Sequence, residues 1–420
     1  MLTSQSCSVM HDMSVTRLFF KKYSPQKLSG VKCRAFKNTD FVRKHILDLA
    51  PYQPIVPFDV LSEQLDIPVD EIVKLDANEN PYGPPEAVFK ALAQSKFPHI
   101  YPDPESRRLR AQLSLDCGIP ADNILVGCGA DELIDLLLRI VLEPGDFIVN
   151  TPPTFGMYAF DCAINAGRVI DIPRGEAPGF KINVRGIQEA VREYKPKVLF
   201  LTSPNNPDGS IIDPEDIDEL LKLPVLVILD EAYIEFCNSQ ESRMPDVLQH
   251  DNLVVLRTFS KRAGLAGIRI GYGAVPLWLM NYCWRVKQPY NVSVLAEEAA
   301  CAALESKEYL QRVKDLLVEE RGRLFSKLEQ FSSLTPYPSN SNFILTKYVF
   351  SLCDDLQRTD ETHRVTGDAA ELKSYLATRG IIVRYYSSPE QLKSCIRISV
   401  GKPEHTDRLI SALQAYFSDV

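Results

Sequence analysis

The chain has 420 residues, of which 45% are hydrophobic and 24% are charged, a composition typical of globular proteins. This length suggests two or three packing units with an ample core. No apolar run approaches the roughly 20 residues of a membrane-spanning helix, so we expect a soluble protein without membrane contact. The ten cysteines form no Cys-x-x-Cys pair, which leaves a zinc or redox site without support and predicts no bound metal.

Charge is distributed unevenly along the chain. Residues 1–39 hold seven basic residues and one acidic residue, and the remainder holds 40 basic and 54 acidic residues. An acidic body is a poor candidate for binding nucleic acid. The basic, hydroxyl-rich and acid-poor segment 1–39 is typical of an organelle transit peptide. Composition does not separate plastid from mitochondrion; we favour a plastid, or the cytoplasm if the segment is only a disordered tail.

The next segment leads into the first phosphate-binding candidate. Residues 40–49 are amphipathic and end at Ala50-Pro51, and an extended arm is expected to follow, because proline disfavours helix at the residue before it. A helix is predicted over 106–116, capped by Ser106 and closed by Gly118. Residues 124–142 then read as strand, glycine turn and helix, which presents free backbone N–H groups to a phosphate. The alternative is an ordinary connection between a strand and a helix.

Strands and helices alternate in the middle of the chain. Apolar runs at 147–150, 197–202, 225–229 and 253–256 are separated by helical segments. This pattern predicts a parallel sheet covered on both faces. Ligands bind such sheets beyond the carboxyl ends of the strands. Four polar residues lie just past these ends: Asn206, Asp230, Tyr233 and Lys261.

The character of the chain changes after about residue 295. Residues 297–329 have the periodicity of a long charged helix, and residues 351–368 form a polar insertion. Two apolar runs, 381–384 and 395–400, are predicted to pair as strands. We therefore expect an N-terminal arm, a large domain and a smaller α+β domain; their respective ranges are 40–75, 76–295 and 296–420.

The stretch from Arg257 to Gly273 follows a buried strand and combines one lysine and three arginines with Thr258, Ser260 and four glycines. Taken alone, it could be a loop with a solvated lysine. Pyridoxal phosphate needs a nucleophilic lysine, a carboxylate for its ring nitrogen, donors for its ring oxygen and a cradle for its phosphate. The sequence supplies these groups in that order as Lys261; Asp230; Tyr233 with Asn206; and Gly129, Ala130 and Asp131 with Thr258, Ser260 and Arg269.

At this point the chain resembles a known family over roughly residues 45–420. The matching stretches are 75–81 (LDANENP), 101–103 (YPD), 129–132 (GADE), 153–158 (PTFGMY), 203–209 (SPNNPDG), 230–233 (DEAY), 258–261 (TFSK), 265–271 (LAGIRIG) and 396–401 (IRISVG). The chain resembles the fold-type I pyridoxal phosphate-dependent aminotransferases. Within their class II family, it resembles most the histidinol-phosphate aminotransferases. The resemblance implies an α/β fold with a mostly parallel central sheet in the large domain.

The resemblance also implies roles for individual residues. Lys261 would bind the cofactor as a Schiff base and move the proton, Asp230 would pair with the ring nitrogen, and Asn206 and Tyr233 would hold the ring oxygen. Further cofactor contacts would come from Phe155, stacked on the ring, and from Tyr101 of a neighbouring subunit, which implies a homodimer with shared sites. Substrate would be bound by Arg397 at the α-carboxylate, by Arg384 and Tyr52 at the phosphate, and by Asn78.

The implied reaction transfers an amino group between L-glutamate and imidazole acetol phosphate in histidine biosynthesis. Alternatives are an aromatic amino acid aminotransferase, a lyase resembling threonine-phosphate decarboxylase and a non-catalytic cofactor-binding protein. Two residues depart from the family's pattern. Asp208 stands where threonine is common, a loop position expected to leave the cofactor unaffected. Arg262 follows the lysine where small or apolar residues are usual, and the sequence offers no account of it.

Overall fold

The computed structural model describes residues 38–52, 54–238, 242–351, 364–365 and 369–418. The predicted transit peptide lies almost entirely outside these ranges, as does most of the predicted insertion at 351–368. The chain divides into two units, residues 1–47 and 48–420. The described part of the first unit contains two short 3₁₀ helices, Asn38–Phe41 and Lys44–Ile46.

The central sheet of the second unit has seven strands in the order β2-β8-β7-β6-β5-β3-β4. These strands are β2 (Ile124–Gly127), β3 (Phe147–Asn150), β4 (Arg168–Asp171), β5 (Val198–Thr202), β6 (Leu226–Asp230), β7 (Leu253–Thr258) and β8 (Gly271–Ala274). Only the two pairings of β8 are antiparallel. The predicted α/β fold with a mostly parallel sheet is confirmed.

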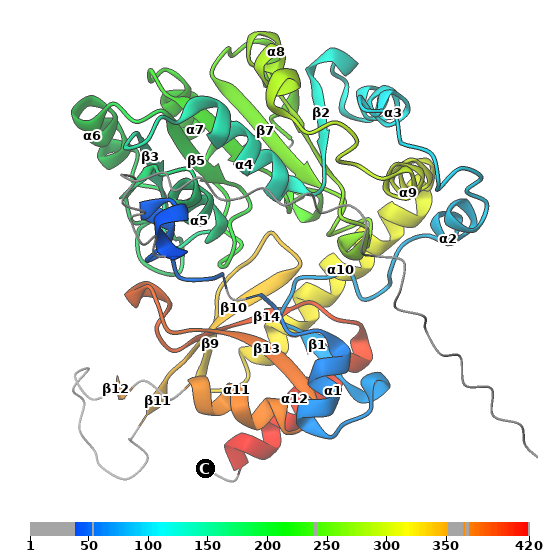
Figure 1. The fold of residues 1–420 in the computed structure, drawn as a ribbon. Coiled ribbons are helices and arrows are strands. Elements are labelled where there is room, and N and C mark those ends of the chain that lie inside the picture. The colour runs from blue at the N-terminus through cyan, green and yellow to red at the C-terminus, as the bar shows by residue number, and fades with distance from the viewer. Residues whose placement is uncertain (1–37, 53, 239–241, 352–363, 366–368, 419–420) are drawn as a thin grey trace, which may run out of the picture. The chain divides into compact units, whose positions relative to one another are not determined.

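Helices cover both faces of this sheet (Figure 1). One face packs against α2 (Glu86–Ala93), α3 (Arg107–Cys117), α6 (Val184–Tyr194), α7 (Pro214–Leu221) and α9 (Val294–Glu305). The other packs against α4 (Ala130–Val141), α5 (Met157–Ile164) and α8 (Leu277–Val286). Val227 and Leu229 belong to the first core and Ile228 to the second, because successive strand residues point to opposite faces. Burial on both sides explains why the strands read as continuous apolar runs.

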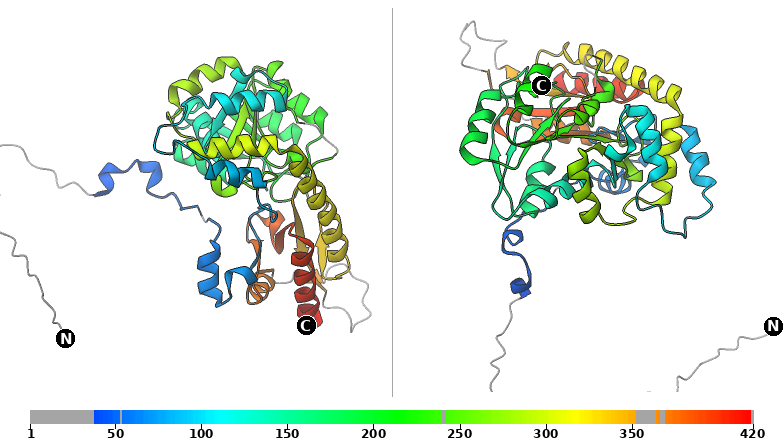
Figure 2. Two further views of the ribbon diagram at one scale, coloured as in Figure 1. Left: turned by 90° about the vertical axis from the view of Figure 1, so that its right-hand side faces the viewer. Right: turned by 90° about the horizontal axis from the view of Figure 1, so that it is seen from above.

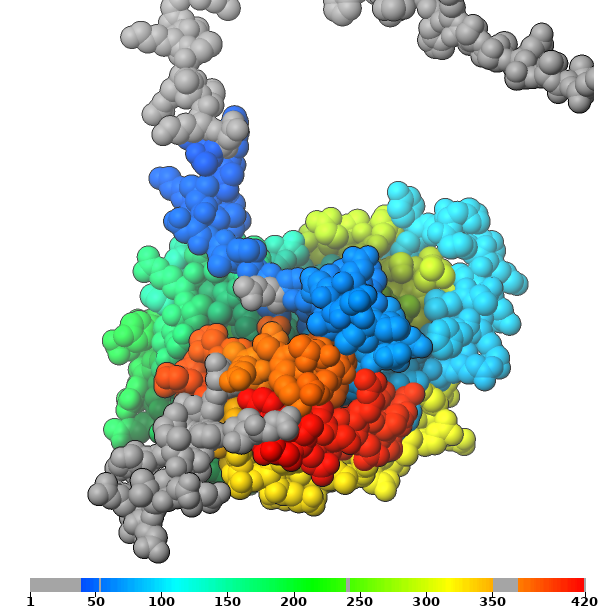
Figure 3. Space-filling model, turned by 90° about the horizontal axis from the view of Figure 1, so that it is seen from below, coloured from blue at the N-terminus to red at the C-terminus, as the bar shows by residue number. Residues whose placement is uncertain are grey.

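A second sheet has five strands in the order β1-β13-β14-β10-β9. They are β1 (Val73–Leu75), β9 (Leu334–Pro336), β10 (Phe343–Tyr348), β13 (Ile381–Tyr386) and β14 (Cys395–Ser399). Its core includes residues of α10 (Lys307–Leu328), α11 (Ala369–Ala377) and α12 (Pro403–Ser418), and Figure 3 shows these helices together on one face. A separate two-stranded antiparallel sheet pairs β11 (Phe350–Ser351) with β12 (Arg364–Val365).

Three local expectations were wrong. Residues Phe58–Leu65 form helix α1 within the predicted extended arm, because Leu61 buries its side chain against Ile72 and Ile382. Ser106 takes a left-handed conformation without a capping hydrogen bond, although Gly118 closes α3 as predicted. The single helix expected over 297–329 is divided into α9 and α10, because Ser306 leaves the helical conformation.

A small core joins the regions around the two sheets. Val313 and Leu317 of α10 pack with Phe343 of β10, with Val400 directly after β14, and with Phe236, which follows β6 of the central sheet. Helix α10 runs from the end of α9 toward the small sheet (Figures 1 and 2). None of the helices in the described ranges is both long and apolar enough to cross a membrane.

Candidate active site

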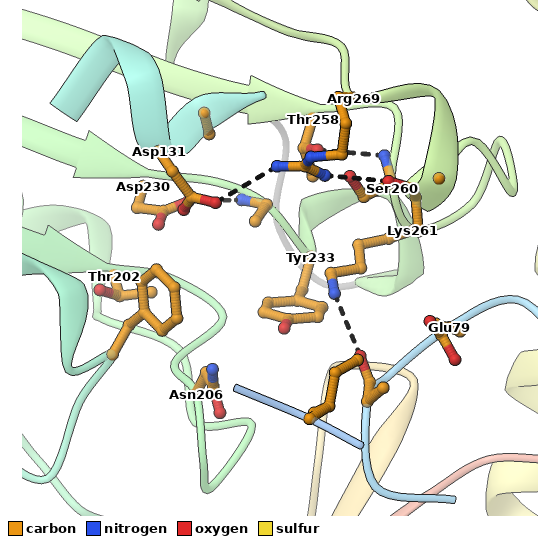
Figure 4. Close-up of a pocket in the computed structure, with 17 residues that line it drawn as sticks. Glu79, Asp131, Thr202, Asn206, Asp230, Tyr233, Thr258, Ser260, Lys261 and Arg269 are labelled. Atoms are coloured by element: carbon orange, nitrogen blue, oxygen red, sulfur yellow. Dashed lines mark hydrogen bonds and ion pairs between the residues drawn. The ribbon is translucent and has the colours of Figure 1, made fainter. Parts of the chain in front are cut away.

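A cavity of about 320 Å³ lies beyond the carboxyl ends of β5, β6 and β7 (Figure 4). It is the location that a parallel sheet predicts for a ligand site. Ten of the residues assigned from sequence to the cofactor line it: Ala130, Asp131, Phe155, Asn206, Asp230, Tyr233, Thr258, Ser260, Lys261 and Arg269. Thr202, which the sequence did not single out, lines it as well.

Asp230 ends strand β6 and faces Thr202 of the neighbouring strand. Its side chain is buried, with 5% of the residue exposed. Burial raises the pKa of Asp230, while hydrogen bonds from the Tyr158 hydroxyl and the Ala232 amide oppose that rise. These donors lie 2.6 Å and 2.9 Å from the two carboxylate oxygens. The site therefore presents a buried carboxylate whose ionised form is supported by two hydrogen bonds.

Lys261 and Tyr233 face each other across the cavity. The Lys261 amino group lies 5.4 Å from the centre of the Tyr233 ring and 3.4 Å from the carbonyl oxygen of Ala77. The Tyr233 hydroxyl accepts a hydrogen bond of 3.1 Å from Asn78, which leaves its own proton free to be donated. Asn78 is fixed in turn by two hydrogen bonds with Ser399. The Lys261 amine and the Tyr233 hydroxyl are thus both available to a bound molecule.

The other end of the cavity has the form of an anion cradle. Gly129 has a positive φ of 87°, and a Cβ atom there would lie 2.6 Å from a guanidinium nitrogen of Arg269. A Cβ atom on Gly271 would lie 2.6 Å from the amide nitrogen of Ala130. Helix α4 begins at Ala130, so its first amide groups have no partner within the helix. Backbone amides, hydroxyls and an arginine therefore meet here, and these donors fit the phosphate of pyridoxal phosphate.

A second cavity of about 410 Å³ shares Phe155, Asn206, Tyr233 and Lys261 with the first. All four residues assigned to the substrate from sequence line it: Tyr52, Asn78, Arg384 and Arg397. The two arginines are direct partners across β13 and β14, as their expected positions on neighbouring strands imply. Together the two cavities place a lysine and a buried carboxylate beside two arginines.

The two arginines differ in their surroundings. Arg397 donates to the side-chain oxygen of Asn206 at 2.5 Å and to the carbonyl oxygen of Asp76 at 2.6 Å. For Arg384, the described residues supply no hydrogen-bond or ion-pair partner. Arg384 thus presents an unpaired cation to the second cavity, which favours an anionic ligand.

Tyr101 is the one predicted cofactor residue that lies away from both cavities. Its ring stacks on Tyr290 at 4.6 Å, and 79% of the residue is exposed. The prediction that it binds the cofactor therefore requires a second subunit. For Asn78, both ends of the side-chain amide are already bonded to Tyr233 and Ser399, so its contact with substrate stays a prediction.

The comparison with protein families agrees with this geometry. Residues 70–413 match the family model for aminotransferase class I and II. The chain belongs to this aminotransferase family. Among its sequence relatives, the chloroplastic histidinol-phosphate aminotransferase of Nicotiana plumbaginifolia is 56% identical over 90% of this chain and 87% of the relative.

Other relatives extend the same relationship. The histidinol-phosphate aminotransferase of Roseiflexus castenholzii is 45% identical, covering 90% of this chain and 98% of that protein. The crystal structure of histidinol-phosphate aminotransferase from Sinorhizobium meliloti, in complex with pyridoxal-5'-phosphate, has a TM-score of 0.76 and 26% identity, covering 92% of this chain and 97% of that chain. Within the class I and II aminotransferases, the chain is thus placed with the histidinol-phosphate enzymes.

The sequence analysis missed residues that do not face the cavity but form hydrogen bonds to residues that line or carry it. Tyr158 is fully buried and stacks on Phe200 at 4.5 Å, with its hydroxyl 2.9 Å from Thr202 as well as 2.6 Å from Asp230. It lies in the matching stretch 153–158, but the sequence analysis assigned it no role. Asp208 does lie in a turn, but it is 1% exposed and accepts hydrogen bonds from Asn205 and Ser210. It therefore holds the turn that carries Asn206.

We predict that Tyr158→Phe slows the reaction. The change removes one hydrogen bond to Asp230, which raises the pKa of that carboxyl and weakens its pairing with a protonated ring nitrogen. A charge-assisted hydrogen bond is worth about 1.5–3 kcal/mol, so the single-turnover rate with L-glutamate should fall roughly 10- to 100-fold. Tyr348→Phe, in the small-domain core, is the matched control. Equal rates in both variants would remove Tyr158 from this role.

Proposed function

We propose that the chain is a pyridoxal phosphate-dependent transaminase that exchanges an amino group between L-glutamate and imidazole acetol phosphate in histidine biosynthesis. One observation carries the proposal: the cavity with Lys261 and Asp230 opens onto a second cavity that contains Arg384 and Arg397. The names of the relatives point to the same reaction.

The cofactor site follows from the donors around the first cavity. When bound, pyridoxal phosphate supplies an aldehyde that bonds to amines and a ring that accepts electrons from a broken Cα–H bond. Lys261 would bind the aldehyde carbon through its amino group. The phosphate would be held by the remaining donors of the cradle: Gly129, Ala130, Asp131, Thr258, Ser260 and Arg269.

The ring would be oriented by three side chains from separate strand ends. Asp230 would hold a proton on the ring nitrogen, because its carboxylate is buried and hydrogen-bonded. The Asn206 oxygen already accepts from Arg397, so the amide nitrogen of Asn206 is the end left to donate to the ring oxygen. Tyr233 would supply the second donor, and Phe155 would cover the ring face.

In this proposal, Lys261 carries out the proton transfer. Its amine would take the proton from the Cα of the amino donor and return it to the cofactor carbon, which is general acid–base catalysis by one group. The amino acceptor then uses the same path in reverse. This amine lies in the cavity, 5.4 Å from the centre of the Tyr233 ring.

Two substrates must bind in turn. Arg397 would bind the α-carboxylate of glutamate, while Arg384 and Tyr52 would receive the phosphate of histidinol phosphate. Because the arginines are strand partners, an anion on either one lies close to the same reacting amine. Asn78 would act at this boundary through its hydrogen bond to Tyr233.

Substrate choice is tested by single-turnover reactions with histidinol phosphate, L-glutamate, L-phenylalanine and threonine phosphate. We expect fast reactions with the first two. Arg384→Ala should lower kcat/KM about 100-fold with histidinol phosphate and much less with glutamate, since a lost charged partner costs about 3 kcal/mol. Arg379→Ala, outside both cavities, is the control. A fast reaction with phenylalanine alone, or carbon dioxide release from threonine phosphate, would contradict the assignment.

We further propose a homodimer in which Tyr101 contacts the cofactor phosphate of the neighbouring subunit. Tyr101 belongs to an exposed apolar segment with Phe97 and Ile100, whose exposed fractions are 79%, 57% and 54%. Such a group on a surface favours association with another protein surface. The proposal also accounts for the distance of Tyr101 from its own cavities.

Mixed dimers test this arrangement. A protomer with Lys261→Ala paired with one carrying Tyr101→Ala should regain one intact site and thus about half of the wild-type activity, because a two-fold dimer exchanges equivalent residues. The two protomers would be purified together through different tags. Activity no higher than the mean of the two parent dimers would contradict the shared site.

We propose that the protein acts in plastids. The basic, acid-poor N-terminal segment supports this, as do the names of relatives described as chloroplastic. N-terminal sequencing of the protein from isolated plastids should find a start near residue 40. An intact Met1 in fractions free of organelles would contradict the proposal.

A further inference from the structure

Arg262 and Glu235 connect two segments of the active site. Glu235 lies in the 3₁₀ helix Ile234–Phe236, directly after the segment that carries Asp230 and Tyr233. One oxygen of its carboxylate is 2.6 Å from the guanidinium of Arg262 and 3.1 Å from that of Arg257. The side chains of Glu235, Arg257 and Arg262 are 12%, 13% and 20% exposed. This triad therefore spans two strand ends in a largely dry environment.

The backbone next to Lys261 is held at the same place. The carbonyl oxygen of Arg262 accepts a hydrogen bond of 2.8 Å from Asn80. Gly264 has a φ of 69°, and a Cβ atom there would lie 2.5 Å from the backbone of Gly83. The turn after Lys261 is thus fixed by the 80–84 segment through its backbone and by Glu235 through the Arg262 side chain.

The charges of the triad suggest a role other than simple stability. Glu235 keeps Arg257 as an ion-pair partner if Arg262 is lost, so the loss of Arg262 leaves no buried carboxylate unpaired. What disappears is the connection between the Lys261 turn and the Tyr233 segment. Lys261 and Tyr233 are the two groups that must keep their relative positions, because their functional atoms face each other across the cavity.

We propose that Arg262 is a positioning residue for Lys261, acting through Glu235. The ion pair fixes where the lysine amine lies relative to Tyr233 and Asp230, and it sets the local charge felt by that amine. The proposal rests on the assigned role of Lys261. It gives a physical reason for Arg262, for which the sequence alone offered no account.

The test uses the cofactor-loaded enzyme and three variants. A misplaced reacting group commonly costs one to two powers of ten in rate, so Arg262→Ala should lower kcat with glutamate about tenfold while KM changes less than about twofold. Loss of a cation raises the pKa of a neighbouring amine, so the pH midpoint of the visible absorption band should rise by about half a unit. Glu235→Gln should lower kcat too, but it should shift that midpoint downward. Arg262→Lys keeps the charge and should restore the midpoint.

A readout without the cofactor separates positioning from catalysis. In the cofactor-free protein, amide hydrogen exchange over residues 259–265 should be faster in Arg262→Ala than in the wild type. Arg185→Ala breaks an exposed ion pair with Glu189 on α6 and should change none of these quantities. If Arg262→Ala does not fold, Glu235→Gln alone tests the positioning role. The expected result is a downward shift of the pH midpoint of the visible absorption band.

The outcomes separate this inference from the proposed function. Lys261→Ala should abolish the visible band of the protein-bound cofactor, and an unchanged band would overturn the proposed function itself. If that band is lost as expected, but Arg262→Ala keeps wild-type kcat and pH midpoint, only the positioning role is overturned. A drop in thermal stability alone, without either change, would likewise overturn it.

Discussion

A carboxylate buried at a strand end costs free energy unless hydrogen-bond donors surround it, and Asp230 meets that constraint at the centre of the site. Its oxygens accept from Tyr158 and from the Ala232 amide. Tyr158 can serve because it stacks on Phe200 in the second core, between the sheet and α4, α5 and α8. The position of the acid is therefore set by packing behind the sheet, and Lys261 approaches it from the neighbouring strand β7.

The second sheet supports side chains that face the first cavity. Arg397 of β14 donates to Asn206 and to the backbone of Asp76, and Ser399 of the same strand holds Asn78, which holds Tyr233. Two of the groups facing the cavity thus depend on a strand from another sheet. A shift of β14 would therefore reorient Asn206 and Tyr233 together, because both are connected to that strand by hydrogen bonds.

The sequence predicted residues whose positions follow from strand ends, and it failed where contacts join distant segments. Asn206, Asp230 and Lys261 each follow a buried strand, so the geometry of a parallel sheet brings them together. Tyr158 ends the matching stretch 153–158, but it was given no role, because a buried aromatic in a helix is usually part of the core. Asp208 was treated as a loop residue because turn composition says nothing about burial, and it is 1% exposed. Helix α1 was missed because its burial depends on Ile382 of β13.

The role of Arg262 also depends on a contact between distant segments, and here the contact is an ion pair. In the sequence Arg262 places a second cation beside Lys261, and two like charges side by side repel each other unless an acid lies nearby. In the fold, β6 and β7 are adjacent parallel strands, so the segments that follow them emerge side by side and Glu235 reaches Arg262. The added charge is neutralised at the same edge of the sheet that creates it. A residue that looks costly in the sequence therefore becomes a connection between two halves of one site.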